Sequence, residues 1–145
     1  MSDVIITVRG TPAPQGSKRH VGKGVMIESS AAVKPWREAV KAAAMTEYAT
    51  MTAEAVDVDI VFLLRRPKSH YGTGRNASTL RPGMALEAHR TKPDLDKLIR
   101  ATLDALGDAG LWRDDSQVAR ITARKVYAMP AQYTGAIIRV REVTP

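Results

Sequence analysis

The chain has 145 residues and no cysteine, and 22 lysines and arginines against 15 aspartates and glutamates give it a formal net charge of +7. This length suits one domain with its own core, and the lack of cysteine excludes disulfides, thiolate zinc sites and cysteine nucleophiles. No apolar run approaches the ~20 residues of a membrane span, and the N-terminus lacks a signal-peptide pattern. We predict one soluble, cytoplasmic domain over 1–145. Its charge favours a polyanion, most often nucleic acid, although a basic but unrelated enzyme is the alternative.

The first half of the chain predicts strand, loop, helix and strand in that order. Apolar and β-branched residues over 3–9 predict a strand. The stretch 11–24 is rich in proline, glycine and cations, so we expect a charged loop. From about Pro35, apolar residues recur at spacings of three and four, which predicts a helix. Strict alternation over 54–64 then predicts a second strand.

The stretch 65–92 shows no sustained periodicity and contains several prolines and glycines. A loop of this length in a compact domain is often functional or flexible. It carries seven basic residues and one acid, Glu87, so it holds +6 of the chain's +7. We therefore expect its cations to contact a phosphate backbone rather than to form internal salt bridges. These cations are Arg65, Arg66, Lys68, Arg75, Arg81, Arg90 and Lys92.

The second half predicts a helix and two strands. An apolar stripe runs from Leu95 to Leu106, and Gly110 is a natural terminator for that helix. Residues 116–128 and 134–142 alternate as strands do. The predicted order is β-α-β-loop-α-β-β, an α+β fold in which a mixed sheet carries two packed helices.

Four aspartates flank the second predicted helix. Asp94 and Asp96 follow a proline, and on an extended lead-in residues i and i+2 share a face, with Asp96 as the helix N-cap or next to it. Such a pair suits Mg²⁺, which takes oxygen ligands and keeps several waters. Asp114 and Asp115 follow the helix, and if the next strand lies beside the preceding one, Asp115 can return to the mouth of the same site. A helix cap and a polar turn are the structural alternatives, and each remains open.

Other chemistry in the sequence is sparse. The histidines His20, His70 and His89 lack metal-ligand spacing, and Ser17 has no accompanying base. The segment PQGSKR is better explained as a loop that contacts phosphate. No phosphate-binding loop or dinucleotide fingerprint is present, so no nucleotide cofactor is expected. Trp36 and Trp112 are expected in the core.

The segment KPDLDKLIRATLDALGDAGLWRDDSQV, residues 92–118, resembles the RusA family of Holliday junction resolvases. The resemblance implies a homodimeric, Mg²⁺-dependent endodeoxyribonuclease, with Mn²⁺ as a substitute metal. It assigns catalysis and metal binding to Asp94, Asp96 and Asp115. Well-known relatives carry a lysine where this chain has Arg100. Arginine keeps a phosphate contact but does not readily give up a proton, so Lys97 is a possible substitute for that lysine.

The predicted partner is branched DNA, above all the four-way junction, and no membrane is expected. Further DNA contacts are expected from cations outside the loop. These cations are Lys18, Arg19, Lys97 and Lys125. Three alternatives are a nuclease for flaps or D-loops, a non-catalytic protein that binds branched DNA, and, least favoured, a sugar transferase with a metal-binding DxD. The family resemblance suggests, by association alone, that the source is a phage or a prophage.

Overall fold

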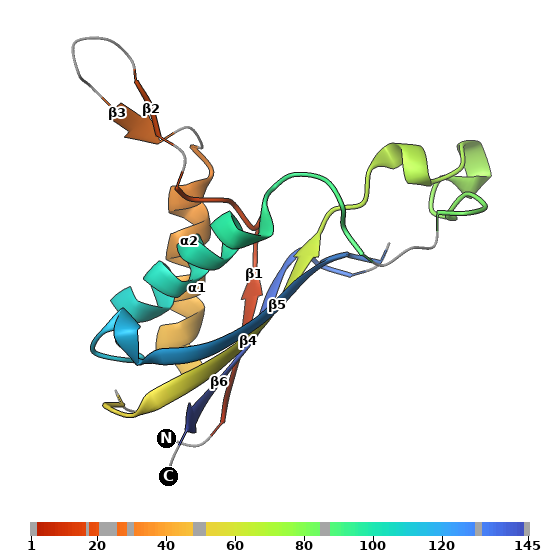
Figure 1. Cartoon of the computed structure of the whole chain (residues 1–145). Helices are drawn as coiled ribbons and strands as arrows, with labels where there is room; N and C mark the ends of the chain where they lie inside the picture. Colours follow the sequence, from red (N-terminus) through yellow and green to blue (C-terminus); the bar gives the residue numbers. More distant parts are fainter. Residues whose placement is uncertain are drawn as a thin grey trace.

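A computed structural model describes residues 3–16, 18–20, 26–28, 31–47, 52–84, 88–129 and 132–143, with only the backbone described for 18–20 and 26–28. Two helices pack on one face of a four-stranded sheet (Figure 1). The strands are β1 (Val4–Arg9), β2 (Lys18–His20), β3 (Met26–Glu28), β4 (Ala55–Leu64), β5 (Val118–Tyr127) and β6 (Gly135–Val143). The helices are α1 (Val33–Glu47) and α2 (Leu95–Asp108). Three 3₁₀ turns are η1 (Lys68–His70), η2 (Gly74–Asn76) and η3 (Asp115–Gln117).

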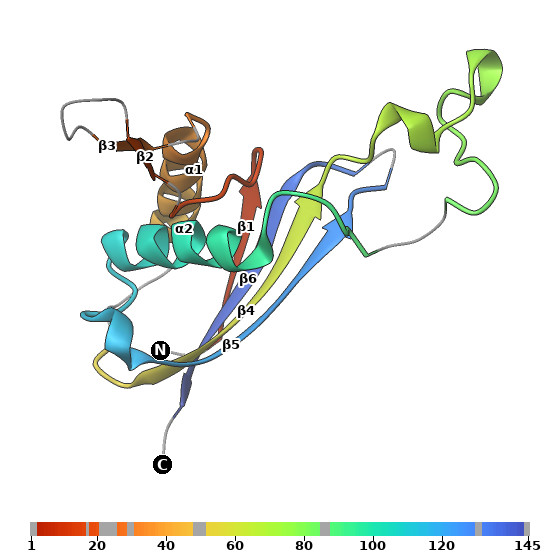
Figure 2. The ribbon, with the colours of Figure 1, turned by 45° about the horizontal axis from the view of Figure 1, so that its top comes forward.

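The sheet is mixed, as predicted, with the strand order β1-β6-β4-β5. Strand β6 lies antiparallel to β1 and to β4, whereas β5 lies parallel to β4. A parallel pair needs a crossover, and here α2 supplies it by running back along the sheet. Figure 2 shows both helices on the same face of the twisted sheet. The helix α2 therefore begins where β4 and β5 end, and it ends where they begin.

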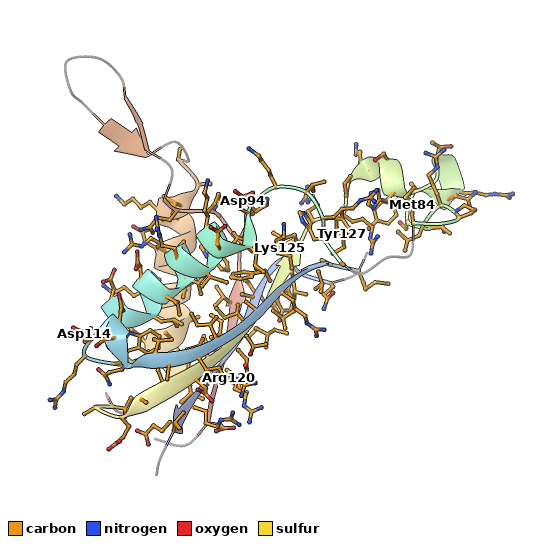
Figure 3. All side chains as sticks on the ribbon, in the orientation of Figure 1. Met84, Asp94, Asp114, Arg120, Lys125 and Tyr127 are labelled. Atoms are coloured by element: carbon orange, nitrogen blue, oxygen red, sulfur yellow. The ribbon has the colours of Figure 1, made fainter. Side chains whose placement is uncertain are left out.

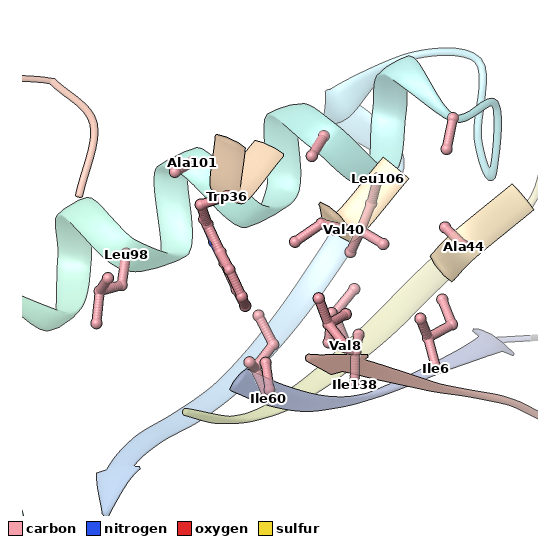
Figure 4. Close-up of a cluster of buried hydrophobic side chains, with 14 of the residues drawn as sticks. Ile6, Val8, Trp36, Val40, Ala44, Ile60, Leu98, Ala101, Leu106 and Ile138 are labelled. Carbon is pink, nitrogen blue, oxygen red and sulfur yellow. The ribbon is translucent and has the colours of Figure 1, made fainter. Parts of the chain in front are cut away.

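The core lies between the two helices and the sheet. Alternate residues of β4 turn inward, and they pack against the apolar stripes of α1 and α2 (Figure 4). Trp36 is 1% exposed, and its Nε1 donates a hydrogen bond to Thr102 Oγ1 at 3.2 Å, which ties the helices together. Trp112 is also buried, so both tryptophans lie in the core as predicted. Neither α1 nor α2 is long and apolar enough to span a bilayer, within the part of the chain that is described.

Several predicted boundaries needed correction. The first helix begins at Val33, ahead of Pro35. The stretch 11–24, expected to be a loop, includes strand β2, which pairs with β3 in a short hairpin; three-residue strands are too short to show an alternating pattern. The prediction that Gly110 ends α2 is confirmed, because the helix stops at Asp108 and Gly110 adopts φ 89°.

The basic stretch 65–92 is not structureless. Residues 65–84, which we call the arm, project from the end of β4 and contain η1, η2 and a bridge between Tyr71 and Leu80 (Figure 1). Ala88 then forms an antiparallel bridge with Val126 on β5. Turns of three residues leave no periodic signature, so sequence pattern could not reveal them. Whether the arm is flexible, as expected, stays a prediction.

Candidate active site

The parallel pairing of β4 and β5 separates the two pairs of aspartates. Asp94 lies at the start of α2, beside the ends of β4 and β5. Asp114 and Asp115 lie after α2, at the start of β5. Because α2 has 14 residues and rises ~1.5 Å per residue, its ends are about 21 Å apart. Figure 3 shows Asp94 and Asp114 at opposite ends of the helix. The expectation that Asp115 returns to the Asp94 site therefore fails within one chain.

The carboxylate of Asp94 is not used to cap the helix. Asp94 is the N-cap residue, with extended backbone angles, but its side chain accepts no capping hydrogen bond. The expectation of Asp96 at or beside the cap needs correction, since the helix starts early enough to place Asp96 in its first turn. The lead-in is thus extended only as far as Asp94. The Asp94 side chain is 51% exposed, and Lys97 Nζ lies 3.6 Å from its Oδ2. This carboxylate is available to a ligand.

Lys125 holds the segment that leads into Asp94. Its Nζ on β5 donates hydrogen bonds to the carbonyl oxygens of Thr91 at 2.6 Å and Pro93 at 2.7 Å. The peptide bond between Lys92 and Pro93 is cis. Charged donors make stronger hydrogen bonds than neutral ones, so Lys125 fixes the start of α2 to the sheet. In Figure 3, Lys125 and Asp94 lie near one another at this end of the molecule.

His89 lies between that segment and the base of the arm. Its backbone N–H donates to Lys125 O at 3.1 Å, and its ring packs against the Tyr127 ring at 4.7 Å between centroids. Burial, and then the charge of Lys125, lower the pKa of His89 below its usual value. Backbone hydrogen bonding at Thr91 opposes this shift less strongly. The ring is therefore neutral near pH 7.

A pH dependence follows from His89. Its folded-state pKa lies below the unfolded-state value of about 6.5, so the unfolded chain binds the proton more readily. Stability is expected to fall as pH drops through 6.5 toward the lower folded-state pKa. In urea unfolding at pH 7.5 and 5.5, His89→Gln should lose less stability on acidification than the native chain does. His70→Gln, which alters the other ring that packs on Tyr127, is the control. An equal loss in the native chain and His89→Gln would contradict the prediction.

Arg66 is buried, unlike the other basic residues of 65–92, which are exposed. It is 4% exposed, and its Nη1 donates to Met84 O at 2.8 Å. Its guanidinium lies 4.7 Å from the centre of the Tyr127 ring. Arg66 therefore makes contacts within the protein, and its expected contact with DNA stays a prediction. Six exposed cations make no ion pair within the described chain. They are Arg65, Lys68, Arg75, Arg81, Arg90 and Lys92.

Arg66→Met is expected to loosen the arm. A hydrogen bond to a charged group contributes about 1.5–3 kcal/mol, so its loss should raise the open population of the arm at least tenfold. Chymotrypsin cleavage at Tyr71 measures that population. Arg65→Met, at the exposed neighbour, is the matched control and should leave the cleavage rate unchanged. Equal cleavage rates in the two variants would show that Arg66 does not hold the arm.

The far end of α2 carries Asp114 and Asp115 in different roles. The Asp114 side chain accepts from Ser116 N at 2.8 Å and caps η3 in a reciprocal arrangement with Gln117. These hydrogen bonds lower the pKa of Asp114. Asp115 is exposed, and its Oδ1 accepts from Trp112 Nε1 at 3.0 Å. It borders an open, polar hollow of 500 Å³. Asp114 thus forms the turn, while Asp115 faces solvent.

The N-terminal loop touches the same helix. Gln15 N donates to Lys97 O at 3.1 Å, and Gln15 Nε2 donates to Asp104 Oδ2 at 2.7 Å. The guanidinium of Arg100 lies against Gly16. No individual role was predicted for Gln15 from the sequence. The only signal for it was its position in a proline-rich loop. The side chains of Lys18 and Arg19 lie outside the described residues, so their expected DNA contacts stay predictions.

The donors at the start of α2 suit magnesium. Among the described residues, no three His, Cys, Asp or Glu side chains gather as a metal site. Mg²⁺, however, is often held by one or two carboxylates, with waters and substrate phosphates as its other ligands. Asp94 at the N-cap and Asp96 in the first turn of α2 provide two carboxylates near the positive end of the helix dipole. The donor chemistry fits the ion without a third residue from the same chain.

The start of α2 thus presents exposed carboxylates beside Lys97, on a basic α+β chain from which the β2–β3 hairpin and the arm project. The sequence model of the RusA family, described as Endodeoxyribonuclease RusA, matches residues 9–141. The chain belongs to this family of Holliday junction endodeoxyribonucleases and is a hydrolase. No curated protein matches the chain significantly. The family match confirms the resemblance and argues against the non-catalytic and sugar-transferase alternatives.

Proposed function

We propose that the chain resolves four-way DNA junctions by paired cuts, as a cytoplasmic homodimer with Mg²⁺, or Mn²⁺ in its place, at Asp94 and Asp96. The observation that carries this proposal is the exposed carboxylate of the α2 N-cap, which accepts no capping hydrogen bond. Asp94 makes no capping bond and lies 3.6 Å from Lys97. A carboxylate whose role was only to cap the helix would accept a backbone N–H.

In this proposal, the residues around Asp94 have different roles in the reaction. Asp94 and Asp96 would hold the metal, which when bound supplies charge neutralisation for the reacting phosphate and a more acidic water. Lys97 in the first turn of α2 and Arg100 in the next turn stabilise negative charge on the phosphate. Arginine side chains do not readily give up a proton, so the role proposed for Arg100 is charge stabilisation and not proton transfer. Lys125 positions Asp94 through the carbonyls of Thr91 and Pro93.

Asp115 takes part through a second copy of the chain. About 21 Å separates the ends of α2, so one chain cannot bring Asp115 to Asp94. A two-fold dimer can place the Asp115 end of each chain beside the Asp94 end of the other. Four-way junctions have approximate two-fold symmetry and need two matched cuts, which two such sites would provide. A role for Asp115 at the Asp94 site thus requires the dimer.

Two basic protrusions flank the start of α2. The β2–β3 hairpin projects on one side and the arm on the other (Figures 1 and 2). We propose that both contact DNA backbone, so that the branch lies over Asp94. Cutting assays test the function: a synthetic junction, a flap and a linear duplex, each with Mg²⁺ or EDTA. Mg²⁺-dependent paired cuts in the junction are expected. Cutting of the flap alone would favour other branched DNA as the substrate.

The arm's cations should show in the salt dependence of binding. Arg75 and Arg81 are exposed, and each phosphate contact adds about 0.9 to the magnitude of the slope of log K against log salt. Arg75→Ala with Arg81→Ala should flatten this slope by roughly two. Fluorescence anisotropy on a junction and a duplex, at several salt concentrations, measures it. Arg139→Ala, a single change at an arginine of β6 that pairs with Asp3, is the comparison. An unchanged slope and affinity would mean that the arm's charges do not touch DNA.

A further inference from the structure

A second hollow lies where the arm meets the connection from β5 to β6. It measures 440 Å³, within the range of small-molecule sites. Arg65, Tyr71 and Ser78 line it from the arm, and Met129, Gln132 and Tyr133 line it from the other side. These two segments are far apart in sequence, and Arg66 holds them together by its contacts with Met84 and Tyr127. The nuclease site described above uses none of the residues of this hollow except Arg65.

The walls of the hollow combine aromatic rings with positive charge. Tyr71 and Tyr133 are both half-buried. The guanidinium of Arg9 lies 4.7 Å from the centre of the Tyr133 ring. Arg65 is exposed at the rim. No acidic residue is among the described residues that line the hollow. Flat π surfaces beside guanidinium groups suit a planar ligand that carries a phosphate.

We propose that this hollow binds one unpaired nucleotide of the branched DNA, with the base against Tyr71 or Tyr133 and a neighbouring phosphate near Arg65. The inference rests on the proposed function, since it assumes a branched DNA substrate. Base stacking on aromatic side chains is sequence-tolerant, because every base has a π face. A branch point is also where bases leave the duplex at the lowest energetic cost. The polar lining argues against an apolar protein partner.

The position of the hollow links the unpaired nucleotide to the cutting site. Tyr127 lies at the base of the arm, with Arg66 over its ring and the His89 ring at 4.7 Å (Figure 3). The backbone of His89 in turn bonds to Lys125, which holds the segment before Asp94. One packed group of side chains would therefore hold a base in the hollow at a fixed position relative to the active site. We infer that the hollow selects DNA with a displaced base close to the scissile phosphate.

A binding experiment in EDTA tests this inference without any cutting. The probe is a junction that carries one unpaired 2-aminopurine at the branch, and its control has an abasic residue at that position. The native chain should bind the base-bearing junction about tenfold more tightly than the abasic one. Stacking on a tyrosine should also quench the fluorescence of the 2-aminopurine. Tyr71→Ala with Tyr133→Ala should remove both effects. Tyr71→Phe with Tyr133→Phe should keep them, because the rings remain.

A second variant distinguishes loss of base binding from misfolding of the alanine variant. Ser78→Leu places an aliphatic side chain in the hollow from an exposed position, adds no ring on which a base could stack, and keeps both tyrosines. It should also remove the preference for the base-bearing junction. Equal binding of the two junctions by the native chain, or a preference that persists in Ser78→Leu, would overturn the inference. Failure of the nuclease proposal is a separate result, namely absence of Mg²⁺-dependent cutting, and it leaves this binding readout unaffected.

Discussion

Asp94→Asn and Asp96→Asn are each expected to slow junction cutting by about a thousandfold, and Asp115→Asn should do the same. Asparagine keeps the size of the side chain and removes the charge that holds the metal. Loss of several kcal/mol of charge stabilisation corresponds to three factors of ten in rate. Junction affinity should stay unchanged or rise, because each substitution removes negative charge near DNA and leaves every cation in place. Single-turnover cutting and anisotropy measure the two quantities.

Asp114→Asn is the matched control for these variants. Asp114 is next to Asp115, but its carboxylate caps η3 through Ser116 N. Asparagine caps about as well as aspartate, so fold and cutting rate should both be preserved. A near-native rate in any one of the three variants Asp94→Asn, Asp96→Asn or Asp115→Asn would remove that residue from the proposed set of metal ligands.

A mixed dimer of Asp96→Asn with Asp115→Asn is expected to recover activity that neither variant has alone. If each site takes Asp96 from one chain and Asp115 from the other, both changes fall in the same site. The remaining site is then intact. Such a dimer should make the first cut at about half the native rate, because one of two equivalent sites survives. It should leave a nicked junction rather than a resolved one. Two affinity tags on co-expressed chains allow the mixed dimer to be purified.

The opposite result has an equally definite meaning. If each site belonged to a single chain, the mixed dimer would carry one damaged residue in each site and would not cut. Light scattering on the native chain accompanies this experiment, since a purely monomeric protein that still made paired cuts would exclude the dimer. A mixed dimer of Asp94→Asn with Asp96→Asn is the control. It should be inactive under the shared arrangement, because each of its sites lacks one carboxylate.

Much of the fold follows from periodicity in the sequence. The alternation in β4 and the apolar stripe of α2 are long enough to be recognised, and the core residues Trp36 and Leu98 lie where the stripes place them. The hairpin β2–β3 and the turns of the arm were missed, because elements of three residues carry no period. The burial of Arg66 was also missed. Its partners, Met84 O and Tyr127, are far enough away in sequence that only the folded arm brings them together.

Residues for the candidate site could be predicted from the sequence, but their arrangement could not, and the assignment of Asp94, Asp96 and Asp115 stays a prediction. Residue order, spacing and the family resemblance pointed to these three aspartates, yet they do not determine the direction of β5. Had β5 been antiparallel to β4, Asp115 would lie at the same end of the sheet as Asp94. The observed parallel pairing of Val58 with Ile121 and of Leu64 with Tyr127 places it at the other end. Strand direction depends on the crossover of α2, which only the tertiary structure reveals.

In the proposed dimer, the length of α2 also sets the distance between the two cuts. If each Asp115 end meets the Asp94 end of a second chain, the two α2 helices run antiparallel and the catalytic centres lie about one helix length apart. That length is about 21 Å for 14 residues. Along one strand of B-form DNA it corresponds to roughly six nucleotide steps of 3.4 Å. Insertion of one helical turn in α2 would lengthen this spacing, and the distance between the two incisions should shift with it.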